Sequence, residues 1–200
     1  MHADVQKLSA AVAQHCVHYI SATITQHGKC HVALAGGATP KALYALLANP
    51  ELARQIEWDK VHVYFGDERY VPHDSPASNY CMARTVLLDK VPLPGSNIHP
   101  VPTRAADAQR DAQAYAALLE NNLPLANRVP VFDLILLGMG EDGHTASLFP
   151  GTSILHETQQ PAAAVYVDKL ASWRISLTYP VLNAARCVIC LLYTSDAADE

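Results

Sequence analysis

Hydrophobic positions along the chain follow two periods, one typical of helices and one typical of buried strands. Apolar residues have helical spacing over residues 3–27, and Gly28 follows as a helix stop. Runs rich in branched apolar residues, as in strands buried on both faces of a sheet, occupy residues 31–35, 61–65 and 131–137. The pattern therefore predicts a first helix followed by a series of buried strands.

Further helices are predicted between these strands. The turn at residues 36–40 leads into a helix over 41–48, with Pro40 suited to its first turn. A helix over 78–88 follows the second strand, and an alanine-rich helix over 105–121 precedes the third. This alternation predicts an α/β fold with three αβα layers, a mostly parallel twisted sheet and a Rossmann-like arrangement with right-handed crossovers.

Composition narrows the classes of protein to consider. With 200 residues, half of them apolar, the chain is expected to form a single domain. Its net charge of -5 provides no basic field for a polyanion, so we expect no nucleic-acid partner. The apolar runs are far shorter than the roughly 20 residues that cross a bilayer, and the N-terminus has no signal-peptide pattern. We therefore expect a cytoplasmic protein without a membrane partner.

The five cysteines and ten histidines form no disulfide or metal-ligand pattern. Cys187 and Cys190 have CxxC spacing without a second pair, and their segment resembles a buried strand with inert thiols. His15 and His18 lie three apart without an acidic neighbour, which predicts a solvated helix face. We expect no metal and no cofactor.

Three loops follow the predicted strands and are expected to meet at the carboxyl ends of the sheet, where such folds bind ligands. The first, residues 36–40, is rich in glycine and leads into a helix N-terminus, which favours an anion such as phosphate. Within it, Thr39 either donates a hydroxyl to that anion or caps the helix. In the second loop, residues 66–72, Arg69 either holds a phosphate or carboxylate or forms a surface ion pair.

The third loop, residues 138–151, has glycines in a GxGxxG pattern. A dinucleotide site needs this pattern after the first strand, with an acid about 20 residues further on. Here the pattern comes late and Pro150 interrupts the following segment, so no nicotinamide site is predicted. Ser147 has no GxSxG elbow around it, which favours a role at a helix start or in substrate contact over a nucleophile.

Several motifs resemble, in order and spacing, those of the 6-phosphogluconolactonases of the pentose phosphate pathway. They are GGATP at 36–40, GDERYVP at 66–72, SNY at 78–80, LGMGEDGHTASLFPG at 137–151 and the arginine segment RISLT at 174–178. The resemblance spans about residues 3–188. It implies the sugar-phosphate isomerase, or deaminase-like, version of the predicted fold.

The glucosamine-6-phosphate deaminases and isomerases share this fold and a similar DGH loop. Their loop carries an acid five residues after the histidine, where this chain has Phe149. Their second loop ends in Asp-Glu-Tyr, where this chain has Arg69 in the last position. Both differences favour the lactonase. A non-catalytic sugar-phosphate-binding protein is a further alternative, but it would not need both Asp142 and His144.

The lactonase resemblance implies a small-molecule sugar-phosphate lactone as substrate, 6-phospho-D-glucono-1,5-lactone. Its hydrolysis to 6-phospho-D-gluconate is the second step of the oxidative pentose phosphate pathway. We expect His144 to be the general base, because histidine titrates near pH 6.5 and can take a proton from water. Either Asp142 or, across the cleft, Asp67 is expected to orient its imidazole. A structural histidine is the alternative for His144.

The other expected contacts come from backbone groups and arginines. The developing oxyanion is expected to face backbone N–H groups of the tight turn at Gly138, Gly140 and Gly143. The phosphate is expected to bind the turn formed by Gly36, Gly37, Ala38 and Thr39 together with Arg69 and Arg174. Binding the remote phosphate would then fix the lactone against the base.

The end of the chain departs from the lactonase pattern. Residues 1–190 are expected to form a single lactonase domain whose C-terminal part is incomplete. The resemblance implies a loop with glycine and lysine and a final helix after Cys190, whereas residues 191–200 read LLYTSDAADE. We expect this tail to be a truncation or foreign sequence. The oligomeric state stays open between a monomer and a small homo-oligomer.

Overall fold

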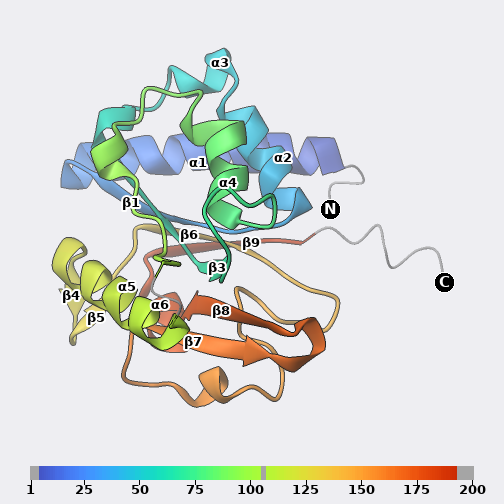
Figure 1. Ribbon diagram of the computed structural model, residues 1–200. Helices are drawn as coiled ribbons and strands as arrows, with labels where there is room; N and C mark the ends of the chain where they lie inside the picture. The colour runs from blue at the N-terminus through green and yellow to red at the C-terminus, as the bar shows by residue number, and fades with distance from the viewer. Residues whose placement is uncertain (1–4, 105–106, 193–200) are drawn as a thin grey trace.

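The centre of the fold is a parallel sheet. The structure, a computed structural model, describes residues 5–104 and 107–192 (Figure 1). Four parallel strands form this sheet in the order β2-β1-β6-β9. They are β1 (Cys30–Leu34), β2 (Val61–Phe65), β6 (Leu134–Gly138) and β9 (Cys187–Leu191). The predicted α/β class with a mostly parallel sheet is confirmed.

Helices cover both faces of this sheet (Figure 1). One face carries α1 (Val5–His27), α2 (Ala38–Leu47), α3 (Pro50–Ala53) and α4 (Asn79–Ala83), the last continuing into a π-helical turn over Arg84–Leu88. The other face carries α5 (Ala108–Asn122) and α6 (Tyr179–Ala184). Short 3-10 turns lie at Trp58–Lys60, Gly95–Asn97, Ser153–His156 and Asp168–Leu170.

A second sheet lies beside α5 and was not predicted from the sequence. Its strands are β3 (Asp67–Arg69), β8 (Ser172–Leu177) and β7 (Ala162–Val167), which pair antiparallel in the order β3-β8-β7. A further two-stranded hairpin joins β4 (Leu125–Ala126) to β5 (Val129–Pro130). The second predicted loop, residues 66–72, therefore contains a strand. That strand joins the second sheet directly after β2 ends.

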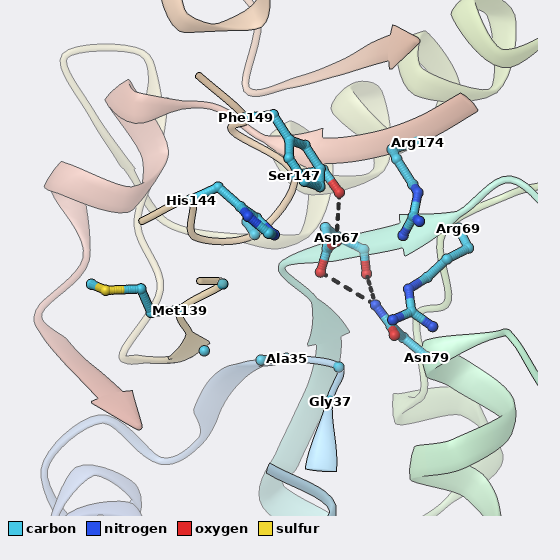
Figure 2. Close-up of a pocket in the computed structure, with 14 residues that line it drawn as sticks. Ala35, Gly37, Asp67, Arg69, Asn79, Met139, His144, Ser147, Phe149 and Arg174 are labelled. Atoms are coloured by element: carbon cyan, nitrogen blue, oxygen red, sulfur yellow. Dashed lines mark hydrogen bonds between the residues drawn. The ribbon is translucent and has the colours of Figure 1, made fainter. Parts of the chain in front are cut away.

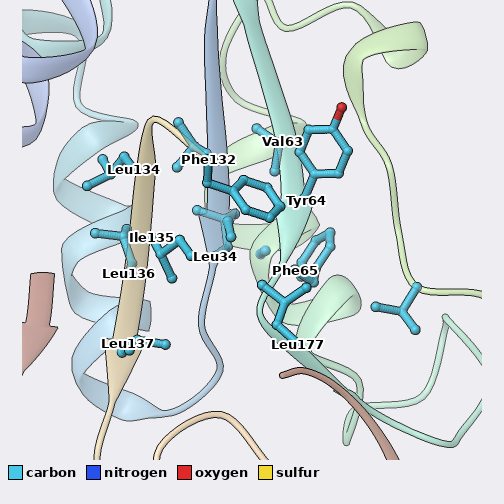
Figure 3. Close-up of a cluster of buried hydrophobic side chains, with 14 of the residues drawn as sticks. Leu34, Val63, Tyr64, Phe65, Phe132, Leu134, Ile135, Leu136, Leu137 and Leu177 are labelled. Atoms are coloured by element: carbon cyan, nitrogen blue, oxygen red, sulfur yellow. The ribbon is translucent and has the colours of Figure 1, made fainter. Parts of the chain in front are cut away.

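The hydrophobic core surrounds the middle strands of the parallel sheet (Figure 3). Leu134, Ile135 and Leu136 of β6 are fully buried, as a strand covered on both faces must be. Phe65 of β2 and Leu177 of β8 are fully buried too and belong to the same cluster. The strand that precedes the third loop is thus held rigidly on both sides.

The strand β6 and the helix α2 begin at other residues than the sequence predicts. The strand expected over 131–137 begins at Leu134, because the Asp133 carboxylate accepts the His31 backbone N–H at 2.8 Å. Helix α2 begins at Ala38, with Gly37 as its N-cap, so Thr39 lies inside the helix and the prediction that it caps the helix is wrong. The helix expected over 78–88 begins as predicted, with the Ser78 hydroxyl accepting the Cys81 N–H at 3.1 Å.

The cysteines of β9 are not in the core, contrary to the prediction. β9 is an edge strand of the parallel sheet, and its burial alternates, so that Cys187 is half-buried and Cys190 is exposed. Partial burial nevertheless raises the pKa of both thiols above the ordinary value. Within residues 5–104 and 107–192, no group of histidine, cysteine and acidic side chains is placed to hold a metal ion.

Two predictions concern the outer surface of the molecule. His15 and His18 are exposed on α1, which confirms the solvated helix face. In the part of the chain that the structure describes, no helix is long and apolar enough to cross a membrane.

Candidate active site

A cavity of about 190 Å³ lies where β1, β2 and β6 end (Figure 2). All three predicted loops contribute to its wall, so their convergence is confirmed. Eight of the expected site residues line it: Gly36, Gly37, Asp67, Arg69, Gly138, Gly140, His144 and Arg174. Ala38 and Thr39, although described, are not among its lining residues, because α2 begins at Ala38 and leads away from the cavity. Asp142 lines an adjoining hollow that shares Arg69, His144, Phe149 and Arg174 with the cavity.

The third loop closes on itself through backbone hydrogen bonds. The Gly140 N–H donates to the His144 carbonyl at 2.8 Å, and the Gly143 N–H donates to the Gly140 carbonyl at 2.9 Å. The Thr145 hydroxyl donates to the Gly138 carbonyl at 2.8 Å. The expectation that Gly140 and Gly143 present their N–H groups to an oxyanion is therefore wrong, because the tight turn uses both groups to hold its own shape.

This loop places His144 against a carboxylate. Nδ1 of His144 contacts Oδ1 of Asp142, and the same oxygen accepts the His144 backbone N–H at 3.3 Å. The Lys169 ammonium, followed by His144, holds the pKa of Asp142 far below its usual range. Asp142 is therefore ionised and accepts the hydrogen of Nδ1. Nε2 is left as the basic nitrogen of the ring.

The His144 ring is also fixed by packing. It stacks on Phe149 with ring centroids 3.8 Å apart and planes 26° apart. A Cβ atom on Gly140 would overlap Cε1 and Nδ1 of His144, so this position has to be glycine for the ring to lie where it does. Phe149 is buried, and Figure 2 shows it beside His144 at the cavity wall.

Asp67 does not contact His144. Its Oδ2 accepts the Ser147 hydroxyl at 2.6 Å, and its Oδ1 accepts the Asn79 side-chain amide at 3.2 Å (Figure 2). Of the two acids that could orient the base, the structure places only Asp142 against it. Ser147 is fully buried, and its hydroxyl supports Asp67.

Two arginines stand side by side at the other end of the cavity from His144 (Figure 2). Arg69 of β3 and Arg174 of β8 are register partners in the second sheet. Burial, and then the positive charge of Arg69, lower the pKa of Arg174. Among the described residues neither guanidinium forms an ion pair with a carboxylate, so the surface ion pair considered for Arg69 is not formed. Two adjacent cations whose hydrogen-bond partners, the Ala77 carbonyl and the Ser172 hydroxyl, are neutral favour an anionic ligand.

The start of α2 borders the same cavity. Gly36 and Gly37 line it, and no side chain caps the helix, so the first backbone N–H groups of α2 have no side-chain acceptor. A Cβ atom on Gly36 would overlap the Asn79 side chain, which packs directly on this backbone. The turn thus places a helix N-terminus at the cavity that the two arginines also line.

Sequence reasoning missed two residues that hold this site together. Asn79 is buried, and its amide donates to both the carbonyl and the carboxylate of Asp67. The buried Glu68 carboxylate accepts the N–H groups of Arg69, Asn79 and Tyr80 at 2.7 to 2.8 Å. Burial raises the pKa of Glu68 despite these bonds. The SNY motif was the available signal, because all three of its residues donate hydrogen bonds to acids of the second loop.

Comparison with known proteins gives a family. The sequence profile described as "Glucosamine-6-phosphate isomerases/6-phosphogluconolactonase" matches residues 3–199. The chain belongs to this family. A relative from Synechocystis sp. named "6-phosphogluconolactonase" is 47% identical over 174 residues, which cover 86% of this chain and 70% of the relative. A relative of the same name from Mycobacterium tuberculosis is 36% identical over 201 residues, covering 98% of this chain and 81% of the relative.

Solved structures of the family have the same fold. The structure titled "Three dimensional structure and catalytic mechanism of 6-phosphogluconolactonase from Trypanosoma brucei" is 39% identical, with a TM-score of 0.86. The match covers 95% of this chain and 79% of that chain. The resemblance and the fold type inferred from the sequence are thus confirmed. The expected mismatch of the tail at 191–200 stays a prediction, because residues 193–200 lie outside the described residues.

Proposed function

We propose that the protein hydrolyses 6-phospho-D-glucono-1,5-lactone to 6-phospho-D-gluconate in the oxidative pentose phosphate pathway. The observation that carries this proposal is one cavity with His144, held by Asp142 of the adjoining hollow, at one end and Arg69 and Arg174 at the other. Relatives named 6-phosphogluconolactonase, at 33% to 47% identity, support the same activity. The enzyme is a carboxylic ester hydrolase acting on a lactone.

His144 performs the proton transfers of this reaction. Nε2 takes a proton from a water molecule as the water oxygen attacks C1 of the lactone, and the carbonyl oxygen gains the negative charge. Asp142, ionised beside Lys169, stabilises the imidazolium that forms and keeps the proton of Nδ1 in place. When the tetrahedral intermediate collapses, the bond from C1 to the ring oxygen breaks. His144 returns its proton to that oxygen, which becomes the C5 hydroxyl.

The phosphate binds at the opposite end of the cavity. Arg69 and Arg174 supply two guanidinium groups, and the N-terminus of α2 after Gly37 supplies backbone N–H groups. Because the lactone ring joins the phosphate to C1, fixing the phosphate fixes the carbonyl relative to His144. Such positioning can lower the barrier by several kcal/mol, up to about 7–11 in the best cases.

Asp67 binds the hydroxyl groups of the sugar in this proposal. The Ser147 hydroxyl and the Asn79 amide fix its carboxylate on the cavity wall between the two ends. An ionised carboxylate can accept about four hydrogen bonds, so it has acceptor positions left for the substrate. Its role is to orient the ring rather than to orient His144.

Phe149 disfavours the deaminase alternative. In the deaminases this position carries an acid of the ring-opening apparatus, whereas here a buried phenyl ring stacks on the base. The cavity therefore has a base for water but lacks that acid. The non-catalytic alternative is disfavoured by the ordered contact between Asp142 and His144, since a binding protein does not need an oriented base.

One experiment separates the three functions. Freshly prepared 6-phosphogluconolactone and glucosamine 6-phosphate are offered in parallel, with acid release and ammonia release followed against a blank for spontaneous hydrolysis. We expect accelerated acid release from the lactone and no ammonia. Ammonia without accelerated acid release would establish the deaminase instead, and binding of either compound without turnover would establish the sugar-phosphate-binding protein.

The cytoplasmic location, the absence of a nucleic-acid partner and the oligomeric state between monomer and small homo-oligomer stay predictions. Two relatives, from rice, are named "Probable 6-phosphogluconolactonase 3, chloroplastic".

A further inference from the structure

Lys169 lies beside the base, and the proposed reaction gives it no role beyond keeping Asp142 ionised. It lies in the 3-10 turn Asp168–Leu170 between β7 and β8, far in sequence from the loop of His144. Its Nζ contacts Oδ2 of Asp142, while Oδ1 of the same carboxylate contacts Nδ1 of His144. The carboxylate thus bridges the ammonium and the imidazole.

Lys169 reaches the base by a second route as well. Its Nζ lies 4.8 Å from the centroid of the Phe149 ring, in a cation–π contact. Phe149 in turn stacks on His144 at 3.8 Å. The four side chains Lys169, Asp142, His144 and Phe149 therefore form a closed ring of contacts, and Lys169 touches both neighbours of the base.

We propose that Lys169 is a positioning residue, which fixes Asp142 and Phe149 and so holds the His144 ring in the orientation and tautomer needed for lactone hydrolysis. Asp142 is exposed on a loop, and an exposed carboxylate has several rotamers available. Lys169 ties it to the rigid hairpin of β7 and β8. A stabilising role for the fold explains less, because an ion pair whose lysine side chain is 52% exposed contributes little to stability.

Lys169 is less suited to bind the phosphate directly. Its charge is already matched by Asp142, whereas Arg69 and Arg174 have no carboxylate partner among the described residues. It also lines only the adjoining hollow, while both arginines line the cavity itself. A positioning residue should affect kcat, and a phosphate ligand should affect KM.

The test compares Lys169→Met with Lys169→Arg in the full chain. We expect Lys169→Met to lower kcat about 5- to 10-fold with KM changed less than about twofold, because the base spends less time correctly oriented. Lys169→Arg keeps the charge and should restore most of kcat. In an Asp142→Asn background, Lys169→Met should have a smaller effect than in the parent, since the carboxylate charge is gone and only the contact with Phe149 is left. Lys90→Met removes an exposed lysine outside the cavity and is the matched control.

A second readout does not depend on the reaction. The ring ¹⁵N shifts of His144, recorded at about pH 8 where histidine is neutral, report which nitrogen carries the hydrogen. The parent should show the Nδ1–H tautomer, and Lys169→Met should show a mixture with the Nε2–H tautomer. This inference rests on the proposed function for its kinetic part only, so failure to hydrolyse the lactone would leave the tautomer measurement decisive.

Two results would overturn the proposal. An unchanged tautomer in Lys169→Met would show that the lysine does not hold the base. A rise in KM of tenfold or more at unchanged kcat would make Lys169 a substrate ligand instead.

Discussion

The two ends of the cavity are built in different ways. The base end comes from one short segment, in which Gly140, Asp142, His144 and Phe149 lie within ten residues and contact one another. The anion end comes from the register of β3 and β8, which brings together Arg69 and Arg174 from distant parts of the chain. The comparison shows that one loop can orient a base with its own residues. Two cations, which repel each other, lie side by side here because strand pairing fixes their positions.

The largest expected effect is at the base end. His144→Ala should lower kcat about 10²- to 10⁴-fold, because general-base catalysis contributes a factor of that size. The unfolding transition should change little, since the ring is not part of the hydrophobic core. Steady-state rates on fresh lactone and thermal unfolding measure the two quantities, with His156→Ala, an exposed histidine outside the cavity, as control. Turnover that survives in His144→Ala would disprove the base assignment.

A substitution at the anion end should raise KM more than it lowers kcat. Arg174→Met should raise KM about 10- to 100-fold, because a hydrogen bond to a charged group contributes about 1.5–3 kcal/mol. The effect on kcat should be smaller, and a lactone without the phosphate should lose this dependence altogether. Arg110→Met, on the exposed side of α5, is the control. Equal loss for the phosphorylated and unphosphorylated lactones would contradict phosphate binding by Arg174.

A smaller effect tests whether the base end is organised locally. Gly140→Ala should lower kcat about 10-fold, because the new Cβ would displace the His144 ring and a misplacement of about 1 Å can cost more than that. KM should stay near the parent value, since the arginines are not touched. Gly95→Ala is a matched control, because a Cβ there meets no atom within 4 Å. An increase in KM with kcat intact would mean that the two ends are not independent.

The smallest expected effect on catalysis is that of His31, at the amino end of β1 and away from the cavity, where the change is in stability instead. Burial, and then the charges of Lys29, His62 and His99, lower the pKa of His31 to about 3. Above pH 6.5 the ring is neutral in both states. Between about pH 6.5 and 3 only the unfolded chain takes up the proton, so the free energy of unfolding falls by up to about 1.4 kcal/mol per pH unit.

His31→Phe should remove this part of the pH dependence while keeping a ring stacked near His62. Denaturant unfolding between pH 7 and pH 4 measures it, with the exposed His18→Phe as control. An unchanged slope in His31→Phe would show that another group causes the acid sensitivity. In His31→Phe, the free energy of unfolding should lose this pH dependence while the pH profile of kcat is retained. That result would show that the pH dependence of stability and that of catalysis arise at opposite ends of the same sheet.

Much of this architecture could be predicted because it follows from local pattern. The buried strands at Val61–Phe65 and Leu134–Gly138 were found from their apolar runs, and the glycine turn at Gly36 from its composition. β3 was missed because a three-residue strand with the sequence Asp-Glu-Arg has no apolar alternation. Cys190 was misplaced in the core because sequence periodicity does not distinguish an edge strand from a central one.

The candidate site also has features that the sequence predicts and features that it does not. Motifs indicated Asp142, His144, Arg69 and Arg174, but not which acid faces the base. The sequence favoured Asp142 only slightly over Asp67, whereas in the structure the Asp67 carboxylate binds Ser147 and Asn79 instead of the base. The oxyanion expectation failed at Gly140 and Gly143 for a related reason. Whether a glycine N–H is free depends on the acceptors that the folded loop brings to it.

The sequence by itself determined the class of fold, the family and the loop that carries the base, because periodicity and motifs are properties of neighbouring residues. Only the tertiary structure decided that Asp142 rather than Asp67 contacts His144 and that Lys169 lies on the far side of that carboxylate. It alone set Arg69 beside Arg174. The contacts of Lys169 with Asp142, of Arg69 with Arg174 and of Ser147 with Asp67 join distant parts of the chain, and their geometry depends on strand register and side-chain packing rather than on local preference.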